Sequence, residues 1–474
     1  MPLSACIVLA ALVLTASAAR GEEAAPSGVT VRVMADGPAI VRETPARRER
    51  LVPLWVANPG VQALSGLKLT VRARGRTVVR DLLDVPPGGA HDTVWLPDPA
   101  PQIARARLTA GDRNLWAGDL AIPRLAERAV IPHSPRVPLG ALQPLMLRGL
   151  NYYPRSQPWP GIWRAMDEAA FEAEFREMGA LHINTIRIFT NLDAEAGLHT
   201  KDGAFTPLLL SRIHTLLTVA ARHRVKVMLT IGAWGDMRDL VFQRRYFRTV
   251  VEPFTYDGRL LAWDLINEPG GDQGPKATPE LARWITTMWE ELRLLAPRHM
   301  LTVGLCWQFD QLWDLGVRPP LAQYHHYSGA AAVQPPGQPP VRNNADDLQN
   351  IANQIDNRPL VIGEFGYSSQ PDANRKDASE ARQLTIVESV LAGAEEGVRR
   401  GVNLSGVYLW CAFHFVPDWM GPFEQGFGVI RPDGSLKPAG ALLRDTYARW
   451  RSRLRAPWEA PRGRGGAAPG GSGW

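Results

Sequence analysis

The sequence is poor in cysteine and lacks the residue spacings that hold metal ions or phosphates. With three cysteines in 474 residues, it cannot be a disulfide-dense scaffold. Its ten histidines are scattered, and none stands at a spacing typical of metal ligands. A glycine-rich phosphate loop is also missing. The sequence therefore predicts no metal site and no cofactor.

Charge and apolar runs exclude two further classes of protein. The formal net charge is +6, carried by arginine more than by lysine and dispersed among alanine, proline and glycine. No basic stripe with interleaved aromatics is present, which argues against nucleic-acid binding. After the N-terminal segment, no apolar run is long enough to span a bilayer. We expect a monomer with no nucleic-acid partner and, once a signal peptide is cleaved, no membrane association.

An apolar stretch occupies residues 3–19, although no lysine or arginine precedes it. Its end, Ala16-Ser17-Ala18, fits the small-residue cleavage pattern of a secretory signal peptide. We therefore predict a signal peptide over residues 1–19 and a secreted or periplasmic protein. The mature chain would keep Cys306 and Cys411, which export would allow to pair. Buried free thiols near strands are an equally good interpretation.

Residues 28–125 show short alternating segments typical of β-strands, separated by turn residues such as Asn58-Pro59-Gly60. About seven strands in a hundred residues predict an immunoglobulin-like β-sandwich. We expect a spacer or a support for the rest of the chain in preference to a sugar-binding module. The segment 126–143 is proline-rich and is predicted to be a linker.

From residue 144 the pattern changes to strands alternating with helices, which predicts an α/β fold. Eight such units over residues 144–456 predict a (β/α)8 TIM barrel. The expected strands lie near 146–150, 184–189, 225–231, 260–266, 300–304, 321–325, 359–363 and 405–410. The expected helices are 167–179, 207–223, 279–295, 345–355, 379–400 and 439–454. Residues 457–474 are low in complexity and are predicted to be a disordered tail.

Two of these expected strands end in a glutamate. Glu268 closes the apolar run Leu260–Pro269, and Glu364 closes the run Pro359–Gly366. Glutamate is rarely buried without a partner or a function. Because barrel active sites gather where the strands end, we expect the two carboxyl groups to meet. A pair of carboxyl groups is what cleavage of a glycosidic bond requires.

Other polar and aromatic residues stand at the ends of the remaining strands. Arg187 lies inside an apolar strand, where it needs either a structural ion pair or a function. The chain also has 16 tryptophans, several next to strand ends, where indole faces can stack on sugar rings. The candidate site adds Asn151, Asn267, His325, Tyr327, Trp234, Trp307 and Trp410, with Trp159, Trp163 and Trp419 as further stacking residues if they do not simply pack in the core.

The barrel resembles the clan A glycoside hydrolases, most closely family five, the cellulases and mannanases. The resemblance covers roughly residues 144–455 and excludes the N-terminal sandwich. The matching segments are Leu147–Tyr152, Thr185–Ile188, Trp263–Pro269, His325–Tyr327, Gly363–Gly366 and Trp410.

The resemblance implies that Glu268 is the general acid/base and Glu364 the nucleophile of a retaining double displacement. It also implies that Asn267 contacts the sugar 2-hydroxyl and that His325 orients the site or contacts substrate. Trp410 would form the floor of the −1 subsite, with Asn151, Trp234 and Trp307 also binding substrate. By simple electrostatics, Arg187 would favour the carboxylate form of Glu364, and Tyr327 would orient it.

One segment departs from the family pattern. Many members carry a histidine after the third strand, where this chain has Gly232-Ala-Trp-Gly-Asp236. We expect a secreted retaining β-glycosidase acting on a β-linked glucan or mannan polysaccharide or oligosaccharide, with endo action favoured. The alternatives are an exo-acting enzyme of another clan A family, such as the β-mannosidase or β-galactosidase group, and a non-hydrolytic glycan-binding barrel.

Overall fold

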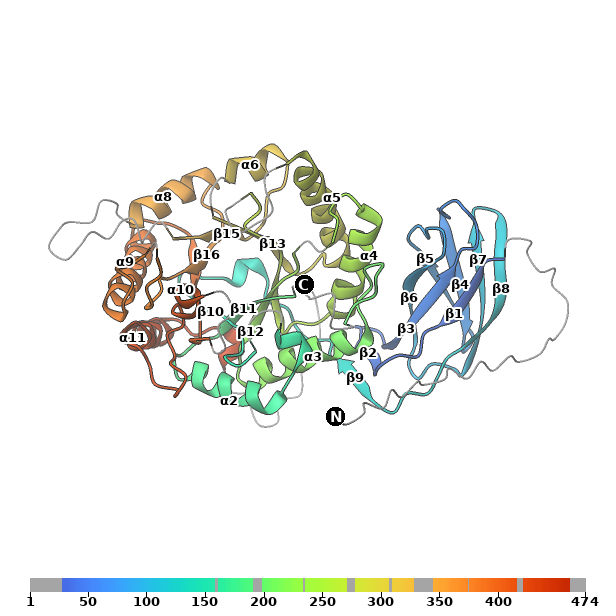
Figure 1. The fold of residues 1–474 in the computed structure, drawn as a ribbon, viewed down its shortest axis with the longest axis horizontal. Helices are drawn as coiled ribbons and strands as arrows, with labels where there is room; N and C mark the ends of the chain where they lie inside the picture. Colours follow the sequence, from blue (N-terminus) through green and yellow to red (C-terminus); the bar gives the residue numbers. More distant parts are fainter. Residues whose placement is uncertain are drawn as a thin grey trace, which may run out of the picture.

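The computed structural model describes residues 28–157, 161–190, 198–232, 235–270, 278–306, 309–327, 344–373, 375–415 and 421–460. A β-sandwich lies beside a barrel that is ringed by helices (Figure 1). The predicted signal peptide over residues 1–19 lies outside the described residues. Within the described residues, none of the helices combines the length and apolarity that a bilayer crossing requires.

The sandwich consists of a five-stranded and a four-stranded sheet. Alternate residues of each strand point inward, as in β4, where Leu67, Leu69 and Val71 are buried and Lys68 is exposed. The first sheet is ordered β1 (Thr30–Val33), β3 (Arg48–Ala57), β2 (Ala39–Glu43) and β9 (Arg128–Ile131), with β6 (Ala90–Pro97) on β3. The second is ordered β5 (Arg76–Asp81), β4 (Leu67–Ala73), β7 (Ile103–Ala110) and β8 (Arg113–Ala121).

Strand β9 lies inside the segment 126–143 that the sequence predicts to be a linker. It has only four residues among prolines, so its period of two is too short to recognise. It pairs in parallel with β2, which the sequence did not predict either. Its inward residues Ala129 and Ile131 are buried in the same apolar cluster as the barrel helices. The linker is therefore partly a strand that joins the two parts of the protein.

The barrel is closed by eight parallel strands in chain order, which confirms the predicted (β/α)8 fold. Most of these strands are short apolar runs buried on both faces, which explains why the sequence located them. The strands are β10 (Leu147–Asn151), β11 (Thr185–Phe189), β12 (Lys226–Thr230), β13 (Leu260–Asn267), β14 (Met300–Leu305), β15 (Ala322–His325), β16 (Leu360–Phe365) and β17 (Leu404–Leu409).

Helices follow the strands and begin at capping side chains. Asp167, Thr206, Thr278 and Ser379 each accept a hydrogen bond from the first turn of their helix. The sequence did not predict α4, whose buried face includes the polar residues Gln243 and Arg245 and therefore does not form a purely apolar stripe. The main helices are α2 (Glu168–Gly179), α3 (Pro207–Arg222), α4 (Leu240–Val251), α5 (Pro279–Leu295), α6 (Phe309–Asp314), α8 (Asn344–Gln354), α9 (Glu380–Arg399) and α11 (Pro438–Arg453).

Polar contacts fasten the sandwich to the barrel on the side of α3 and α4 (Figure 1). Arg80 of β5 forms a bidentate ion pair with Glu252, which follows α4, at 2.7 and 2.8 Å. His91 Nδ1 lies 2.7 Å from Asp202 Oδ1. Bidentate pairs between half-buried side chains fix orientation as well as distance. The sandwich is thus held against the barrel.

The first residues of the predicted disordered tail are ordered. Residues Pro457–Glu459 form a 3-10 turn, and Glu459 is buried at the N-terminal end of the barrel strands. Its carboxylate accepts hydrogen bonds from Arg148 at 2.5 Å and from the side chain of Asn184 at 3.2 Å. The sequence did not predict this contact, because the low-complexity composition of residues 457–474 describes the segment as a whole and cannot identify one buried side chain within it. Residues 461–474 lie outside the described residues.

Candidate active site

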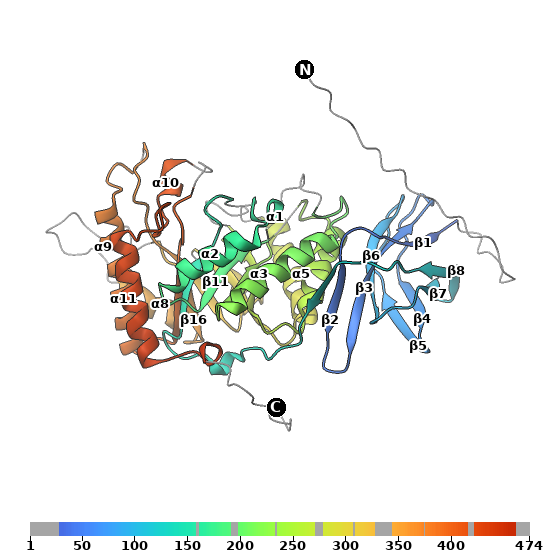
Figure 2. The same cartoon turned by 90° about the horizontal axis from the view of Figure 1, so that it is seen from below.

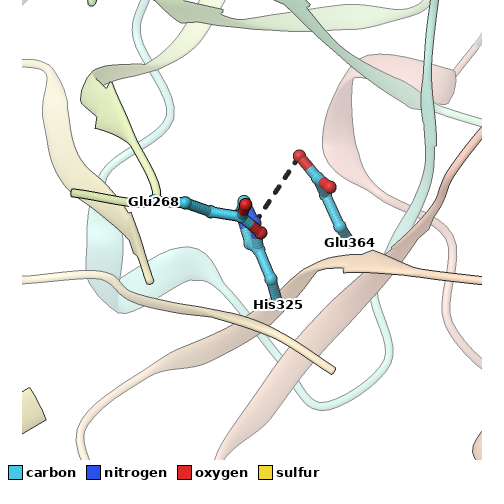
Figure 3. A group of neighbouring side chains, drawn as sticks. All are labelled: Glu268, His325 and Glu364. Carbon is cyan, nitrogen blue, oxygen red and sulfur yellow. Dashed lines mark hydrogen bonds and ion pairs between the residues drawn. The ribbon is translucent and has the colours of Figure 1, made fainter. Parts of the chain in front are cut away.

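Glu268 and Glu364 lie together at the C-terminal end of the barrel, with His325 between them (Figure 3). Glu268 directly follows β13, and Glu364 belongs to β16. One oxygen of each carboxyl group and the His325 Nδ1 atom all lie within 4.8 Å of one another. Both glutamates are buried. Helices α1 (Gly161–Arg164) and α10 (Pro422–Gln425) lie at one common end of the barrel (Figure 2).

The backbone at Glu268 has an unusual conformation. Its φ angle is +44°, in the left-handed region that residues with a Cβ rarely adopt. The amide of Glu268 donates to the carbonyl of Gly304 at 2.8 Å, which continues the pairing of β13 with β14 beyond the last strand residue. The chain therefore turns sharply at Glu268 and holds its side chain at the end of the strand.

Arg187 of β11 is fully buried at the centre of the site and donates to four side chains. Its Nη1 atom lies 2.6 Å from Glu364 Oε1 and 3.1 Å from Asn151 Oδ1. Its Nη2 atom lies 2.7 Å from Asn267 Oδ1. The planar guanidinium presents several donors in fixed directions, so one residue orients all of these acceptors.

Asp264, in the middle of β13, is the second ion-pair partner of Arg187, and sequence reasoning missed it. Its Oδ2 atom accepts from Nε and Nη2 of Arg187 at 2.9 and 2.8 Å, and from Thr230 at 2.8 Å. The amide of Gly304 donates to its Oδ1 atom. A charged residue inside an apolar strand was the available signal, because a fully buried carboxylate needs a cation.

His325 and Tyr327 donate to the two glutamates. His325 Nδ1 lies 2.7 Å from Glu268 Oε1 and 3.5 Å from Glu364 Oε1. The hydroxyl of Tyr327 donates to Glu364 Oε2 at 2.9 Å. Glu364 therefore receives hydrogen bonds on both oxygens, from Arg187 and from Tyr327, and its orientation is fixed before substrate arrives.

The two asparagines of the predicted site occupy different environments. Asn151 is fully buried, and its amide nitrogen donates to the carbonyl of Gly363 at 2.9 Å while its oxygen accepts from Arg187. Through these contacts Asn151 holds Arg187 in place. Asn267 is half-buried, and its side-chain oxygen accepts a hydrogen bond from Arg187.

Trp410 directly follows β17 and lines the same end of the barrel. Its indole nitrogen donates to Glu424 Oε1 at 2.7 Å, and its ring packs edge-on against Tyr153 and Phe189. Burial raises the pKa of Glu424, as does the nearby charge of Glu364. Glu424 is thus a further carboxyl group near Glu364, and nothing in its short helix marked it in the sequence.

Several predicted stacking residues cannot be placed. Trp234, Trp307, Trp159 and Trp419 lie outside the residues whose side chains the structure describes. Trp163 is buried and donates its indole N–H to the carbonyl of Phe189, so it packs in the core. Cys306 and Cys411 are not joined by a disulfide, which answers the question that the sequence left open.

The two glutamates have pKa values shifted in opposite directions. Burial raises the pKa of Glu364, because it outweighs the charge of Arg187. Burial also acts to raise the pKa of Glu268, but the contact with His325 and the charge of Arg187 together outweigh it and lower that pKa. We expected Arg187 to leave Glu364 the more acidic of the two. Since the carboxyl groups interact closely, the ionisation of each one affects that of the other.

A metal ion fits this cluster poorly. Glu268, His325 and Glu364 form a set of three ligands close enough to surround an ion. However, the guanidinium of Arg187 already lies 2.6 Å from Glu364 and compensates its charge. A second cation would be repelled at that distance, so we assign these residues no metal-binding role.

Comparison with known proteins connects this site to one family. The family model described as Cellulase (glycosyl hydrolase family 5) matches residues 150–392. Mannan endo-1,4-beta-mannosidase 8 of Oryza sativa subsp. japonica is 26% identical over 210 residues, which are 38% of this chain and 53% of the relative. The chain thus spans about half the length of the curated relatives that it matches.

Two solved structures have a similar fold. The exo-beta-1,4-mannosidase Op5Man5 from Opitutaceae bacterium strain TAV5 matches with a TM-score of 0.52 and 18% identity, over 65% of this chain and 60% of that one. A variant of GH5_18 from Streptomyces cattleya in complex with Manb1-4GlcNAc also gives 0.52, with 17% identity, over 66% of this chain and 82% of that one. At such identities the likeness concerns the fold alone.

Proposed function

The chain belongs to glycosyl hydrolase family 5, and we propose that it is a secreted, retaining β-glycosidase that hydrolyses β-1,4-linked mannosides. As a glycoside hydrolase of clan A, it acts on a carbohydrate. Our proposal concerns four properties of the protein: its retaining mechanism, its sugar, its endo or exo mode and its export. The predicted signal peptide supports export.

The separation of the two carboxyl groups is the observation that supports retention. An oxygen of Glu268 and an oxygen of Glu364 lie within 4.8 Å of each other. Retaining enzymes keep their carboxyl groups about 5–5.5 Å apart, whereas inverting enzymes need about 6.5–9.5 Å to admit a water. Close approach favours direct attack by one glutamate on the sugar.

In the proposed mechanism Glu364 is the nucleophile. Its Oε2 atom attacks the anomeric carbon while the bond from that carbon to the glycosidic oxygen breaks. Glu268 gives its proton to the leaving oxygen and then, as a carboxylate, takes a proton from the water that hydrolyses the glycosyl-enzyme. Arg187 and Tyr327 hold Glu364 in position throughout, and the amide of Asn267 contacts the sugar 2-hydroxyl.

The proton of the glutamate pair must lie on Glu268 when the glycosidic bond breaks. Without substrate, the contact with His325 lowers the pKa of Glu268 and burial raises the pKa of Glu364. We infer that binding of the sugar reverses this order. A leaving oxygen that accepts a hydrogen bond stabilises the protonated form of Glu268, while Arg187 and Tyr327 remain to stabilise the ionised form of Glu364.

The names of the relatives support a mannoside. The curated relatives are named mannan endo-1,4-beta-mannosidases, and one protein of similar fold is named an exo-beta-1,4-mannosidase. We favour endo action, as the sequence did, because its tryptophans near strand ends suit an extended cleft. The segments that would shape such a cleft lie outside the described residues.

A product profile tests this function. The purified protein is incubated with mannan, β-1,4-mannooligosaccharides and a β-glucan. We expect oligosaccharides of mixed length from mannan, and proton NMR should show the β-anomer as the first product. Release of mannose alone would indicate exo action, an initial α-anomer would indicate inversion, and tight binding without any product would indicate a glycan-binding protein.

Variants assign the two glutamates. Glu268→Ala and Glu364→Ala should each lower activity on mannan by about 10³-fold or more. With a 2,4-dinitrophenyl β-mannoside as substrate and azide added, the Glu268→Ala variant should form the β-glycosyl azide. The Glu364→Ala variant should form the α-glycosyl azide. Glu388→Gln, a change of an exposed glutamate on α9, is the control and should leave activity unchanged. Near-normal activity of both alanine variants would refute the proposal.

A further inference from the structure

Gln323 lies beneath the catalytic pair and takes no part in the mechanism given above. It belongs to β15, two residues before His325, and is fully buried. Its amide nitrogen lies 3.2 Å from Asp264 Oδ2 and 3.1 Å from His325 Nε2. The amide therefore connects the carboxylate that holds Arg187 with the imidazole that contacts Glu268.

The orientation of this amide is determined by Asp264. If nitrogen and oxygen were exchanged, the amide oxygen would face the carboxylate oxygen of Asp264 at the same short distance, which is repulsive. With nitrogen in this place, its two hydrogens reach Asp264 and His325. The amide oxygen accepts no hydrogen bond within the described residues. The amide is thus oriented for donation alone.

This orientation determines where His325 carries its hydrogen. Its Nε2 atom faces an N–H group of Gln323 and must accept. In the neutral ring the hydrogen then lies on Nδ1, which faces Glu268 Oε1 at 2.7 Å and donates to it. A second hydrogen on Nε2 would point directly at the Gln323 N–H group, so the doubly protonated ring is disfavoured.

The barrel makes space for this arrangement with two glycines. A Cβ atom at Gly304 would lie 2.7 Å from both Gln323 Nε2 and His325 Nε2. A Cβ atom at Gly363 would lie 2.5 Å from Gln323 Cγ. Real Cβ atoms do not approach other atoms so closely, and neither glycine has a positive φ angle that would explain its presence. Both positions are therefore open to admit the Gln323 side chain and its contact with His325.

We propose that Gln323 is a positioning residue that holds His325 as the neutral tautomer with hydrogen on Nδ1 and so allows Glu268 to act as the acid. The inference rests on the proposed function of Glu268. With His325 donating to Oε1, the catalytic proton is carried on Oε2 of Glu268 and passes from there to the glycosidic oxygen. A doubly protonated His325 would instead keep Glu268 as a carboxylate with no proton to give.

The charged groups around His325 lie on two sides of the ring. Glu268, directly after β13, and Glu364 of β16 face its Nδ1 atom at 2.7 and 3.5 Å. Asp264, which pairs with Arg187 of β11, is connected to the ring only through Gln323. The N–H group of Gln323 is the contact at Nε2, and it occupies the place that a second ring proton would need.

The test compares leaving groups in Gln323→Met, which keeps the length of the side chain and removes both donors. Mannan and a phenyl β-mannoside have poor leaving groups that must be protonated by the acid, so kcat/KM on them should fall by about 10²-fold. The 2,4-dinitrophenolate leaving group needs no protonation, so kcat/KM on a 2,4-dinitrophenyl β-mannoside should fall less than about threefold. An equal loss on both substrates would contradict the inference.

The pH profile of Gln323→Met provides a second readout. Without the opposing N–H group, the proton is bound by Glu268 in some molecules and by His325 in others. For the substrate with the poor leaving group, we expect the pH profile of kcat/KM to have a lower plateau. We also expect its alkaline limb to move to higher pH, because binding at either residue retains the proton. A purely structural defect would lower the plateau and leave the limb in place, and that result would overturn the proposal.

Gln383→Met is the matched control. Gln383 is also a buried glutamine whose nitrogen donates to protein acceptors, the carbonyls of Tyr367, Gly426 and Phe427, and its oxygen likewise has no partner within the described residues. Its loss should lower the melting temperature without any dependence on the leaving group. If Gln383→Met shows the same dependence, the effect is a general response to a lost amide and the inference fails.

A measurement on the unaltered protein covers the case in which Gln323→Met does not fold. In protein labelled with ¹⁵N-histidine, the His325 signals are assigned by their loss in His325→Asn. We expect Nδ1 to carry hydrogen and Nε2 to show the shift of an unprotonated nitrogen near neutral pH. Hydrogen on Nε2 would refute the inference even if the glutamate variants confirm the proposed function.

Discussion

Arg148 and Glu459 are separated by 311 residues and form an ion pair at the end of the barrel opposite Glu268 and Glu364, with both side chains buried. Arg148 also donates to the backbone carbonyls of His182, Met146 and Leu454. The guanidinium is therefore satisfied only when the segment after α11 folds back over the first strand. The pair fastens the end of the barrel domain to its beginning.

Removal of this carboxylate should destabilise the protein without changing its chemistry. Glu459→Ala leaves a fully buried guanidinium without its anion, for which about 3–5 kcal/mol of unfolding free energy is the expected loss. Urea unfolding measures it, and kcat/KM of the folded variant should be unchanged. Glu290→Ala, which breaks the exposed pair with Arg293, is the control and should cost less than about 1 kcal/mol. Equal small losses would show that the tail is not anchored.

Tyr327→Phe should slow formation of the glycosyl-enzyme. The change removes the hydrogen bond to Glu364 Oε2 but keeps the ring that packs against Phe427. A hydrogen bond to a charged group contributes about 1.5–3 kcal/mol, so kcat/KM should fall by about 10–100-fold. Tyr367→Phe, which removes an exposed hydrogen bond to Asp377, should have no effect. An unchanged rate in Tyr327→Phe would mean that Arg187 alone orients the nucleophile.

The acid side of the pH profile should report the ionisation of Glu364. Burial raises its pKa above the ordinary value of 4.5, so the group stays protonated to a higher pH than an exposed glutamate. Only the carboxylate attacks, and activity is therefore lost as the pH falls through this raised pKa. A 2,4-dinitrophenyl β-mannoside isolates this step because its leaving group needs no acid. An acid limb below pH 4.5 would contradict the direction of the shift.

Arg80→Ala should loosen the sandwich from the barrel. It removes the bidentate pair with Glu252, whose charged hydrogen bonds contribute about 1.5–3 kcal/mol each when one partner is lost. We expect the midpoint temperature of the first unfolding transition in calorimetry to fall and proteolysis within residues 126–143 to become faster. The value of kcat/KM on a short substrate should not change. A selective loss of activity on polymeric mannan would instead show that the position of the sandwich matters for long substrates.

Most of the barrel could be predicted from the sequence, for a physical reason. A parallel strand buried on both faces is a continuous apolar run between turn residues, and β13 and β16 are both of this kind. Their carboxyl ends lie at the same end of any closed barrel, so Glu268 and Glu364 were expected on the same side. Elements without such a pattern were missed: β9 is too short to show a period, and α4 mixes arginine with aromatic and β-branched residues.

The interior of the site was only partly predictable. Arg187 and Asp264 are both charged residues in apolar strands, so each implied a partner, but sequence cannot say that they are partners of each other. The role of Gln323 depends on hydrogen-bond direction, which follows from atoms of three strands and from the room left by Gly304 and Gly363. The pKa directions of the two glutamates likewise depend on the balance between burial and charge, and residue types alone predicted the opposite order.

The left-handed backbone at Glu268 has a consequence for how this protein can evolve. A residue with a Cβ in that conformation costs about 1 kcal/mol or more relative to glycine, so Glu268→Gly would make the fold more stable while removing the acid. Selection for stability alone would therefore drive this position away from glutamate. The glutamate persists only while activity itself is under selection, and a library screened for thermal tolerance should accumulate inactive chains altered at this residue.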